Sequence, residues 1–123
     1  RIAGLEAATR NGPVILGGSS YGGLAAAWLA TQHPERFRGL LLCAPALHWS
    51  EAPVQHPERL CAPEGLTTWI LHGTQDEVVP IGVSERYRDA SGPHVTLEAL
   101  EDGHRLQGSI PRLVSVARML ARA

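Results

Sequence analysis

The chain has 123 residues, a formal net charge of −1 and 44% hydrophobic residues. This length is typical of a single domain with a modest core, so we expect one domain over residues 1–123. A charge so close to zero gives no basic field for nucleic acid and no polybasic patch for a membrane surface, which excludes both classes of partner.

Several other classes of site are also excluded by the sequence. The two cysteines, Cys43 and Cys61, are too few for a disulfide framework, and Cys43 ends an apolar run that predicts a buried thiol. No pair of histidines or cysteines has the spacing of a zinc site, and the sequence contains no phosphate-binding-loop motif. We therefore expect no metal and no cofactor. No apolar run approaches the roughly 18 residues of a membrane span and no signal peptide is recognisable, from which we expect a cytoplasmic protein.

The first half of the chain predicts two strands that alternate with helices. Residues 2–9 carry apolar positions at helical spacing and end at Asn11-Gly12-Pro13. Residues 13–18 read as a buried strand, residues 21–33 as a helix closed by a proline, and residues 38–44 as a second buried strand.

The second half continues this alternation after an irregular segment. Residues 45–65 contain four prolines, and a loop of this length is usually functional or contains a short helix. Residues 67–72 predict a third strand, residues 81–90 a helix, residues 94–100 an edge strand and residues 109–122 a last helix. The alternation of strands and helices indicates parallel pairing and an α/β sandwich.

The turn after the first strand places a serine between glycines. In Gly18-Ser19-Ser20-Tyr21-Gly22-Gly23, Gly18 and Gly22 lie two residues either side of Ser20. We expect both glycines to be required, because the strand and the helix must approach closely without an intervening Cβ. This is the G-x-S-x-G nucleophile elbow with Ser20 at its apex; the alternative is a turn serine that caps the helix.

A serine nucleophile needs a base and an orienting acid, and candidates follow two later strands. Asp76 follows the third strand and His104 the fourth, and the carboxyl ends of parallel strands meet at one edge of a sheet. The order serine, acid, histidine is the order of the α/β-hydrolases. Glu77 is the nearest competitor of Asp76.

On these residues the chain resembles the α/β-hydrolase superfamily, esterases and thioesterases in particular. The segment from His72-Gly73 to Asp76 is similar to the family's acid loop, and Asp102-Gly103-His104 to its histidine loop. The resemblance covers the family's C-terminal part from the elbow onward, and it implies a truncated or minimal α/β-hydrolase fold of about four parallel strands with flanking helices. The family's N-terminal strands have no counterpart upstream.

The resemblance also implies a role for each site residue. Ser20 is the nucleophile, His104 the base that takes its proton, and Asp76 the acid that orients the imidazole. The backbone N–H of Tyr21 is an oxyanion donor. The side chains of Tyr21 and Trp49 either line an acyl pocket or only pack.

The implied activity is the hydrolysis of a small-molecule carboxylic ester or thioester, without a cofactor. Peptidase, lactonase, acyltransferase and perhydrolase activities remain open within the fold, because the pocket decides among them. The alternative from another class is an inactive or weakly active hydrolase-like fragment that serves as a binding or assembly module. A dinucleotide-binding protein lacks its phosphate fingerprint here.

Two departures from the family pattern lead to further expectations. No His-Gly stretch precedes Ser20 to supply a second oxyanion N–H, so we expect weak activity. Right-handed crossovers place the helices between strands on one face and leave the other face to the last helix. The first strand is then an exposed edge, and we expect a homodimer through that edge or face.

The remaining histidines predict no chemistry. His72 ends a strand, and we expect it to be a structural residue that bonds backbone near the acid loop. His33, His48, His56 and His94 are expected to be solvated.

Overall fold

The computed structural model describes residues 14–122, so the helix predicted over residues 2–9 lies outside the described residues. Within them the strands are β1 (Val14–Ser19), β2 (Phe37–Cys43), β3 (Thr68–Gly73) and β4 (Val95–Leu100). They form one four-stranded sheet in the order β1-β2-β3-β4, and every neighbouring pair is parallel. The predicted parallel α/β architecture is therefore confirmed.

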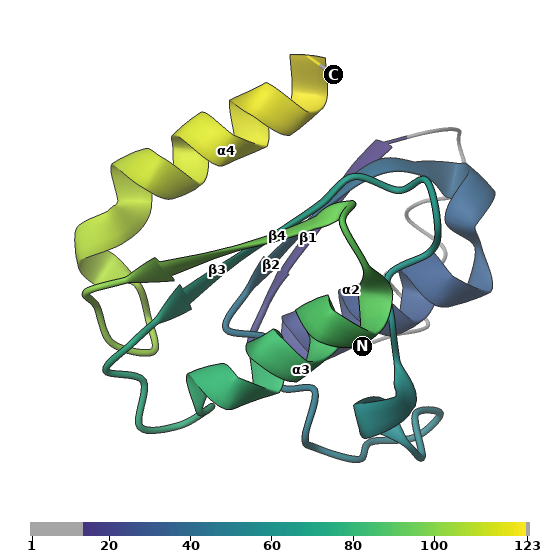
Figure 1. Cartoon of the computed structure of the whole chain (residues 1–123), viewed down its shortest axis with the longest axis horizontal. Helices are drawn as coiled ribbons and strands as arrows, with labels where there is room; N and C mark the ends of the chain where they lie inside the picture. Colours follow the sequence, from purple (N-terminus) through teal and green to yellow (C-terminus); the bar gives the residue numbers. More distant parts are fainter. Residues whose placement is uncertain (1–13, 123) are drawn as a thin grey trace.

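Within residues 14–122, three α-helices cover the two faces of this sheet. Helices α2 (Tyr21–Gln32) and α3 (Ile81–Ser91) lie on one face, and α4 (Ile110–Arg122) is the one described helix on the other (Figure 1). Because the crossovers between parallel strands are right-handed, α2 and α3 fall on the same side, and only the helix after the last strand reaches the opposite side. This distribution is the one that the sequence predicts.

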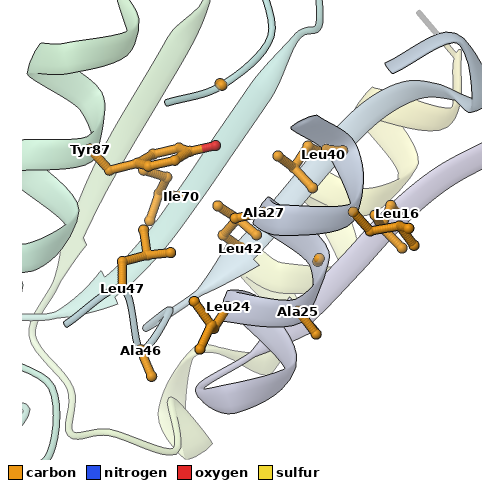
Figure 2. Close-up of a cluster of buried hydrophobic side chains, with 14 of the residues drawn as sticks. Leu16, Leu24, Ala25, Ala27, Leu40, Leu42, Ala46, Leu47, Ile70 and Tyr87 are labelled. Atoms are coloured by element: carbon orange, nitrogen blue, oxygen red, sulfur yellow. The ribbon is translucent and has the colours of Figure 1, made fainter. Parts of the chain in front are cut away.

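The larger core lies between the sheet and the pair α2 and α3. Figure 2 shows Leu24 and Ala27 of α2 next to Leu42 of β2, with Tyr87 of α3 beside Ile70 of β3, and all five are buried. Small alanines on α2 let the helix approach the sheet, and Ala25, Ala26, Ala27 and Ala30 are all buried. The opposite face has a smaller core, in which Leu41 and Leu71 pack with residues of α4 such as Val116 and Leu120. Because both faces are covered, the central strands are continuous apolar runs rather than alternating ones.

The long connection between β2 and β3 is packed rather than open. It contains a short 3₁₀ helix, Pro57–Arg59, and a bridge between Glu51 and Val54. Leu47 is buried, and its carbonyl oxygen accepts a hydrogen bond from Arg86 Nη2 of α3 at 2.7 Å. This contact fixes the start of the connection over the larger core.

The predictions for Cys43, His48 and His56 are confirmed, whereas His33 and His94 are less exposed than expected. Cys43 is buried, and burial raises the pKa of its thiol to about 11. His48 and His56 are exposed as expected. His94 is half-buried because its Nε2 lies 3.1 Å from the Ala62 carbonyl oxygen of the long connection, and His33 is half-buried with Nδ1 3.8 Å from Glu35.

No helix within residues 14–122 combines the length and the apolar character needed to cross a bilayer.

Candidate active site

Ser20 lies at a strained turn between β1 and α2. Its backbone has φ 55° and ψ −116°, which a residue with a Cβ adopts only where its surroundings enforce it. The Ser20 N–H donates to the Cys43 carbonyl oxygen at 2.9 Å, and the Ser20 carbonyl oxygen accepts from the N–H of Ala46 at 2.9 Å and of Gly23 at 3.0 Å. The Ser20 side chain makes no capping bond to α2, so the alternative of a helix-capping serine is not observed.

The glycines of this turn are not equally required. A Cβ on Gly18 would clash with the backbone of Gly22, and a Cβ on Gly23 would lie 2.8 Å from the Cα of Pro45. A Cβ on Gly22 would meet nothing within 4 Å. The expectation that Gly22 must lack a Cβ is therefore wrong: the backbone of Gly22 crowds Gly18, while its own Cβ position points into open space.

The structure brings Ser20, His104 and Asp76 into one line of hydrogen bonds. His104 Nε2 lies 3.1 Å from Ser20 Oγ, and His104 Nδ1 lies 2.7 Å from Asp76 Oδ2. The three side chains follow β1, β4 and β3, whose carboxyl ends share one edge of the sheet. Glu77, the competitor of Asp76, is exposed.

The environment of Asp76 determines where the proton of His104 lies. The Asp76 side chain is fully buried, which alone would raise its pKa, but the pKa is lowered because the hydrogen bond from His104 and those from the N–H groups of Val79 and Val78 outweigh burial. Both backbone bonds reach Oδ1 at 2.8 Å. An ionised carboxylate only accepts, so His104 Nδ1 carries the proton and Nε2 is free to accept from the Ser20 hydroxyl.

A second imidazole contacts the same carboxylate. His72 is fully buried, its Nε2 lies 2.7 Å from the Val79 carbonyl oxygen and 3.3 Å from Asp76 Oδ2, and its Nδ1 lies 2.7 Å from Ser84 Oγ. Burial lowers the pKa of His72. The expectation of a structural histidine that bonds backbone near the acid loop is confirmed. Sequence reasoning missed Ser84, although a small polar residue on the buried side of a helix was the available signal.

The loop that carries His104 is held by Asp102. One Asp102 carboxylate oxygen accepts from the Gly103 N–H at 2.8 Å, and the other accepts from the Ser109 hydroxyl at 2.7 Å and the Gly108 N–H at 3.0 Å. These bonds, with that of Ser109 first, lower the pKa of Asp102. They tie the histidine loop to the start of α4, a role that sequence reasoning did not assign to Asp102.

The two aromatic candidates lie together at the surface beside Ser20. Tyr21 is 40% exposed and Trp49 is 51% exposed. Their ring centroids are 5.9 Å apart and the rings meet edge to face at 71°. A hollow of about 570 Å³ lies elsewhere, lined by Thr31, Cys61, Ser91 and His94 among others. The aromatic pair therefore lies at the surface near Ser20 and does not line that hollow.

Comparisons with known proteins agree with this architecture. Residues 2–64 match the family described as serine aminopeptidase, S33. An α/β superfamily hydrolase structure from Xanthomonas campestris pv. campestris superposes with a TM-score of 0.78 at 25% identity, over 100% of this chain and 67% of that one. No curated protein sequence matches the chain.

Two further structures show the same fold at lower identity. The monoacylglycerol lipase of Paleococcus ferrophilus has a TM-score of 0.76 at 16% identity, over 98% of this chain and 74% of that one. Mouse alpha/beta hydrolase domain-containing protein 10 has a TM-score of 0.76 at 22% identity, over 97% of this chain and 67% of that one. With the family match over about half of its residues, the chain belongs to the serine aminopeptidase S33 family of α/β-hydrolases.

Proposed function

We propose that the protein is a serine hydrolase that cleaves carboxylic esters or thioesters through an acyl-enzyme on Ser20. The observation that carries this proposal is the continuous line from Ser20 Oγ to His104 Nε2 at 3.1 Å and from His104 Nδ1 to Asp76 Oδ2 at 2.7 Å. A buried, ionised acid, a histidine in the matching tautomer and a serine at a strained turn are the parts that nucleophilic acyl transfer needs.

Each residue has a defined task in the proposed reaction. As Ser20 Oγ bonds to the acyl carbon, its proton moves to His104 Nε2, and the Asp76 carboxylate stabilises the resulting imidazolium. His104 then gives this proton to the leaving alcohol or thiol as its bond to the acyl carbon breaks. A water attacks the acyl-enzyme with His104 again as base, which releases the carboxylic acid and restores the Ser20 hydroxyl.

The start of α2 is the proposed oxyanion site. Tyr21 is the first residue of α2, so its backbone N–H lies at the positive end of the helix next to Ser20. A donor there stabilises the negative charge that forms on the substrate oxygen, and loss of one such donor typically costs about 10²–10³ in kcat.

The proposed substrate has an apolar acyl group. Two exposed apolar side chains contact each other next to Ser20: Tyr21 follows Ser20 in the chain, and Trp49 packs edge to face on Tyr21. Exposed apolar side chains grouped at a reactive centre are suited to binding an apolar ligand. The fold is shared with a monoacylglycerol lipase, which is in keeping with this substrate class.

The test compares Ser20 with its neighbour in the same turn. We expect the wild type and Ser19→Ala to release p-nitrophenol from short p-nitrophenyl esters and to be labelled by a fluorophosphonate, because Ser19 is exposed and bonds to neither Asp76 nor His104. Ser20→Ala should lose the label and at least about 10³-fold in kcat. Equal labelling of Ser20→Ala, or none of the wild type, would refute the proposal.

The family match suggests a second reaction that the same assay can separate. Because the family is described as serine aminopeptidases, an amino acid p-nitroanilide is assayed beside the esters. If the protein hydrolyses the anilide faster than the esters, the proposed substrate would be a peptide amide instead of an ester.

A binding or assembly module is the second candidate function. The chain spans 67%, 74% and 67% of the length of the three structures compared. Normal binding of a partner by Ser20→Ala, with no ester or anilide turnover by the wild type, would support this candidate instead.

A further inference from the structure

We infer that His72 and Ser84 are positioning residues that hold the Asp76 carboxylate in line with His104. This inference rests on the proposed function for its catalytic consequence, while its structural content concerns the hydrogen bond from His104 to Asp76. It assigns a task to two buried side chains whose hydrogen bonds go to each other and to Val79, and not to Ser20 or His104.

The orientation of His72 is fixed from both sides of its ring. The Val79 carbonyl oxygen, 2.7 Å from Nε2, can only accept, so Nε2 carries the proton. Nδ1 is then an acceptor, and the Ser84 hydroxyl at 2.7 Å donates to it. Both His72 and Ser84 are fully buried, so no solvent competes for these bonds. Helix α3 therefore sets both the tautomer and the direction of the ring.

The fixed ring supports the turn that carries the acid. The N–H of Val79 donates to Asp76 Oδ1 at 2.8 Å, while the carbonyl of the same residue accepts from His72. His72 Nε2 also lies 3.3 Å from Asp76 Oδ2, the oxygen that receives the His104 proton at 2.7 Å. Loss of the Nε2 donor would thus leave the Val79 carbonyl unpaired and remove a positive edge from beside Oδ2.

An apolar residue in place of His72 would pack but could not replace these contacts. A buried carbonyl without a donor costs more than an exposed one, so the turn would move to find a partner. Since Asp76 Oδ1 is bonded to two backbone N–H groups of that turn, the carboxylate would move with it. A displacement of the orienting acid reduces catalysis without any change at the substrate surface.

Two substitutions at position 72 separate positioning from packing. In His72→Gln the amide nitrogen can take the place of Nε2, whereas in His72→Asn it reaches only the place of Nδ1. We expect His72→Asn to lower kcat about tenfold or more with KM within about twofold of wild type, as loss of a hydrogen bond and misalignment imply. His72→Gln should recover most of this loss. Rates are expressed per site titrated by a fluorophosphonate, so that misfolded protein does not count.

A spectroscopic measurement tests the same inference without turnover. The proton on His104 Nδ1, shared with Asp76, should give a low-field proton NMR signal in the wild type and His72→Gln that is lost or shifted in His72→Asn. If the wild type shows this signal but neither labelling nor turnover, the proposed function fails while the inference is still tested. Equal signals and equal kcat in all three proteins would overturn the inference.

Ser84→Ala keeps the test decisive if His72→Asn does not fold. This variant leaves the bond to Val79 in place and removes only the donor to Nδ1. We expect a shifted low-field signal and a fall in kcat of about threefold or more at unchanged KM. A folded Ser84→Ala with the wild-type signal and kcat would overturn the role of Ser84 and, with it, the inference.

Discussion

His72 and His104 both contact the Asp76 carboxylate, and their surroundings suit them to different roles. His72 is fully buried and bonded to Val79 and Ser84, whereas the His104 side chain is 20% exposed and lies next to Ser20. In the proposed reaction, the partly exposed imidazole of His104 is the one that passes a proton to the substrate. The buried His72 acts through its fixed hydrogen bonds. Its protonation therefore changes the free energy of unfolding and not the transfer of a proton to substrate.

The lowered pKa of His72 predicts a loss of stability in mild acid. Above about pH 6.5, His72 is neutral in both the folded and the unfolded chain, so its contribution to the free energy of unfolding is constant. As the pH falls below that value, the unfolded chain binds a proton that the folded chain does not, and stability is lost until the pH reaches the lowered folded pKa. The slope from this group is at most about 1.4 kcal/mol per pH unit.

Urea unfolding between pH 8 and pH 5 measures this contribution. His72→Gln has no titrating group at this position, so its stability should fall less over the range than that of the wild type. The other histidines are common to both proteins and cancel in the difference. Parallel stability curves for the two proteins would contradict the prediction.

At the scale of elements, three parallel strands each lead to one member of the proposed triad. Strands β1, β4 and β3 end just before Ser20, His104 and Asp76, respectively. Strand β2, which lies between β1 and β3, ends at Cys43, whose carbonyl oxygen accepts a hydrogen bond from the Ser20 N–H. Chain order and strand direction alone predict that these side chains meet, because parallel strands point their carboxyl ends the same way.

Contacts between distant segments mark the limit of what the sequence could predict. The apolar runs Val14–Leu16 and Leu40–Leu42 predicted buried strands; Leu40–Leu42 is buried as expected, but in β1 only Leu16 is buried, because β1 is an edge of the described sheet. Which glycine is sterically required depends on Pro45, which reaches Gly23 only after folding. A small polar residue on the buried side of α3 marks Ser84 as unusual, but its bond to His72 joins two elements, so no local pattern identifies the partner.

The glycines at the start of α2 provide a matched pair of substitutions. Gly23→Ala would place a Cβ 2.8 Å from Pro45, and this overlap should lower the free energy of unfolding by about 1–3 kcal/mol. Gly22→Ala meets nothing within 4 Å, and the helix preference for alanine should leave stability equal or up to about 1 kcal/mol higher. Urea unfolding of both variants checks the difference. Equal destabilisation would show that the turn itself, not Pro45, requires glycine.

At the scale of the whole molecule, the described residues place one helix, α4, on one face of the sheet and two helices, α2 and α3, on the other (Figure 1). A hollow of about 280 Å³ lies next to β1, lined by Gly17, Gly18, Ser19, Leu41, Cys43 and Leu113. Within residues 14–122, β1 pairs only with β2, and Val14 is 40% exposed. An edge strand beside an apolar hollow is a surface on which a second strand can pair.

We therefore expect this chain to self-associate through the β1 edge. Sedimentation velocity should show a weight-average mass that rises with protein concentration. Val14→Lys places a charge on that edge and should shift the chain towards monomer. Thr96→Lys adds the same charge to an exposed position of β4, the opposite edge strand, and should leave association unchanged. A concentration-independent monomer of the wild type would contradict this expectation.

The connection between β2 and β3 divides its residues between two tasks. Its first part is hydrogen-bonded to the turn that carries Ser20 and to α3. The N–H of Ala46 donates to the Ser20 carbonyl oxygen, and the Leu47 carbonyl oxygen accepts from the Arg86 guanidinium. Beyond that anchor it contains none of Ser20, Asp76 and His104, and its Trp49 packs edge to face against Tyr21. We therefore expect substitution of the exposed Trp49 to alter the surface beside Tyr21, whereas Val54, Ala62 and Leu66 of the same connection are buried in the larger core and must be kept.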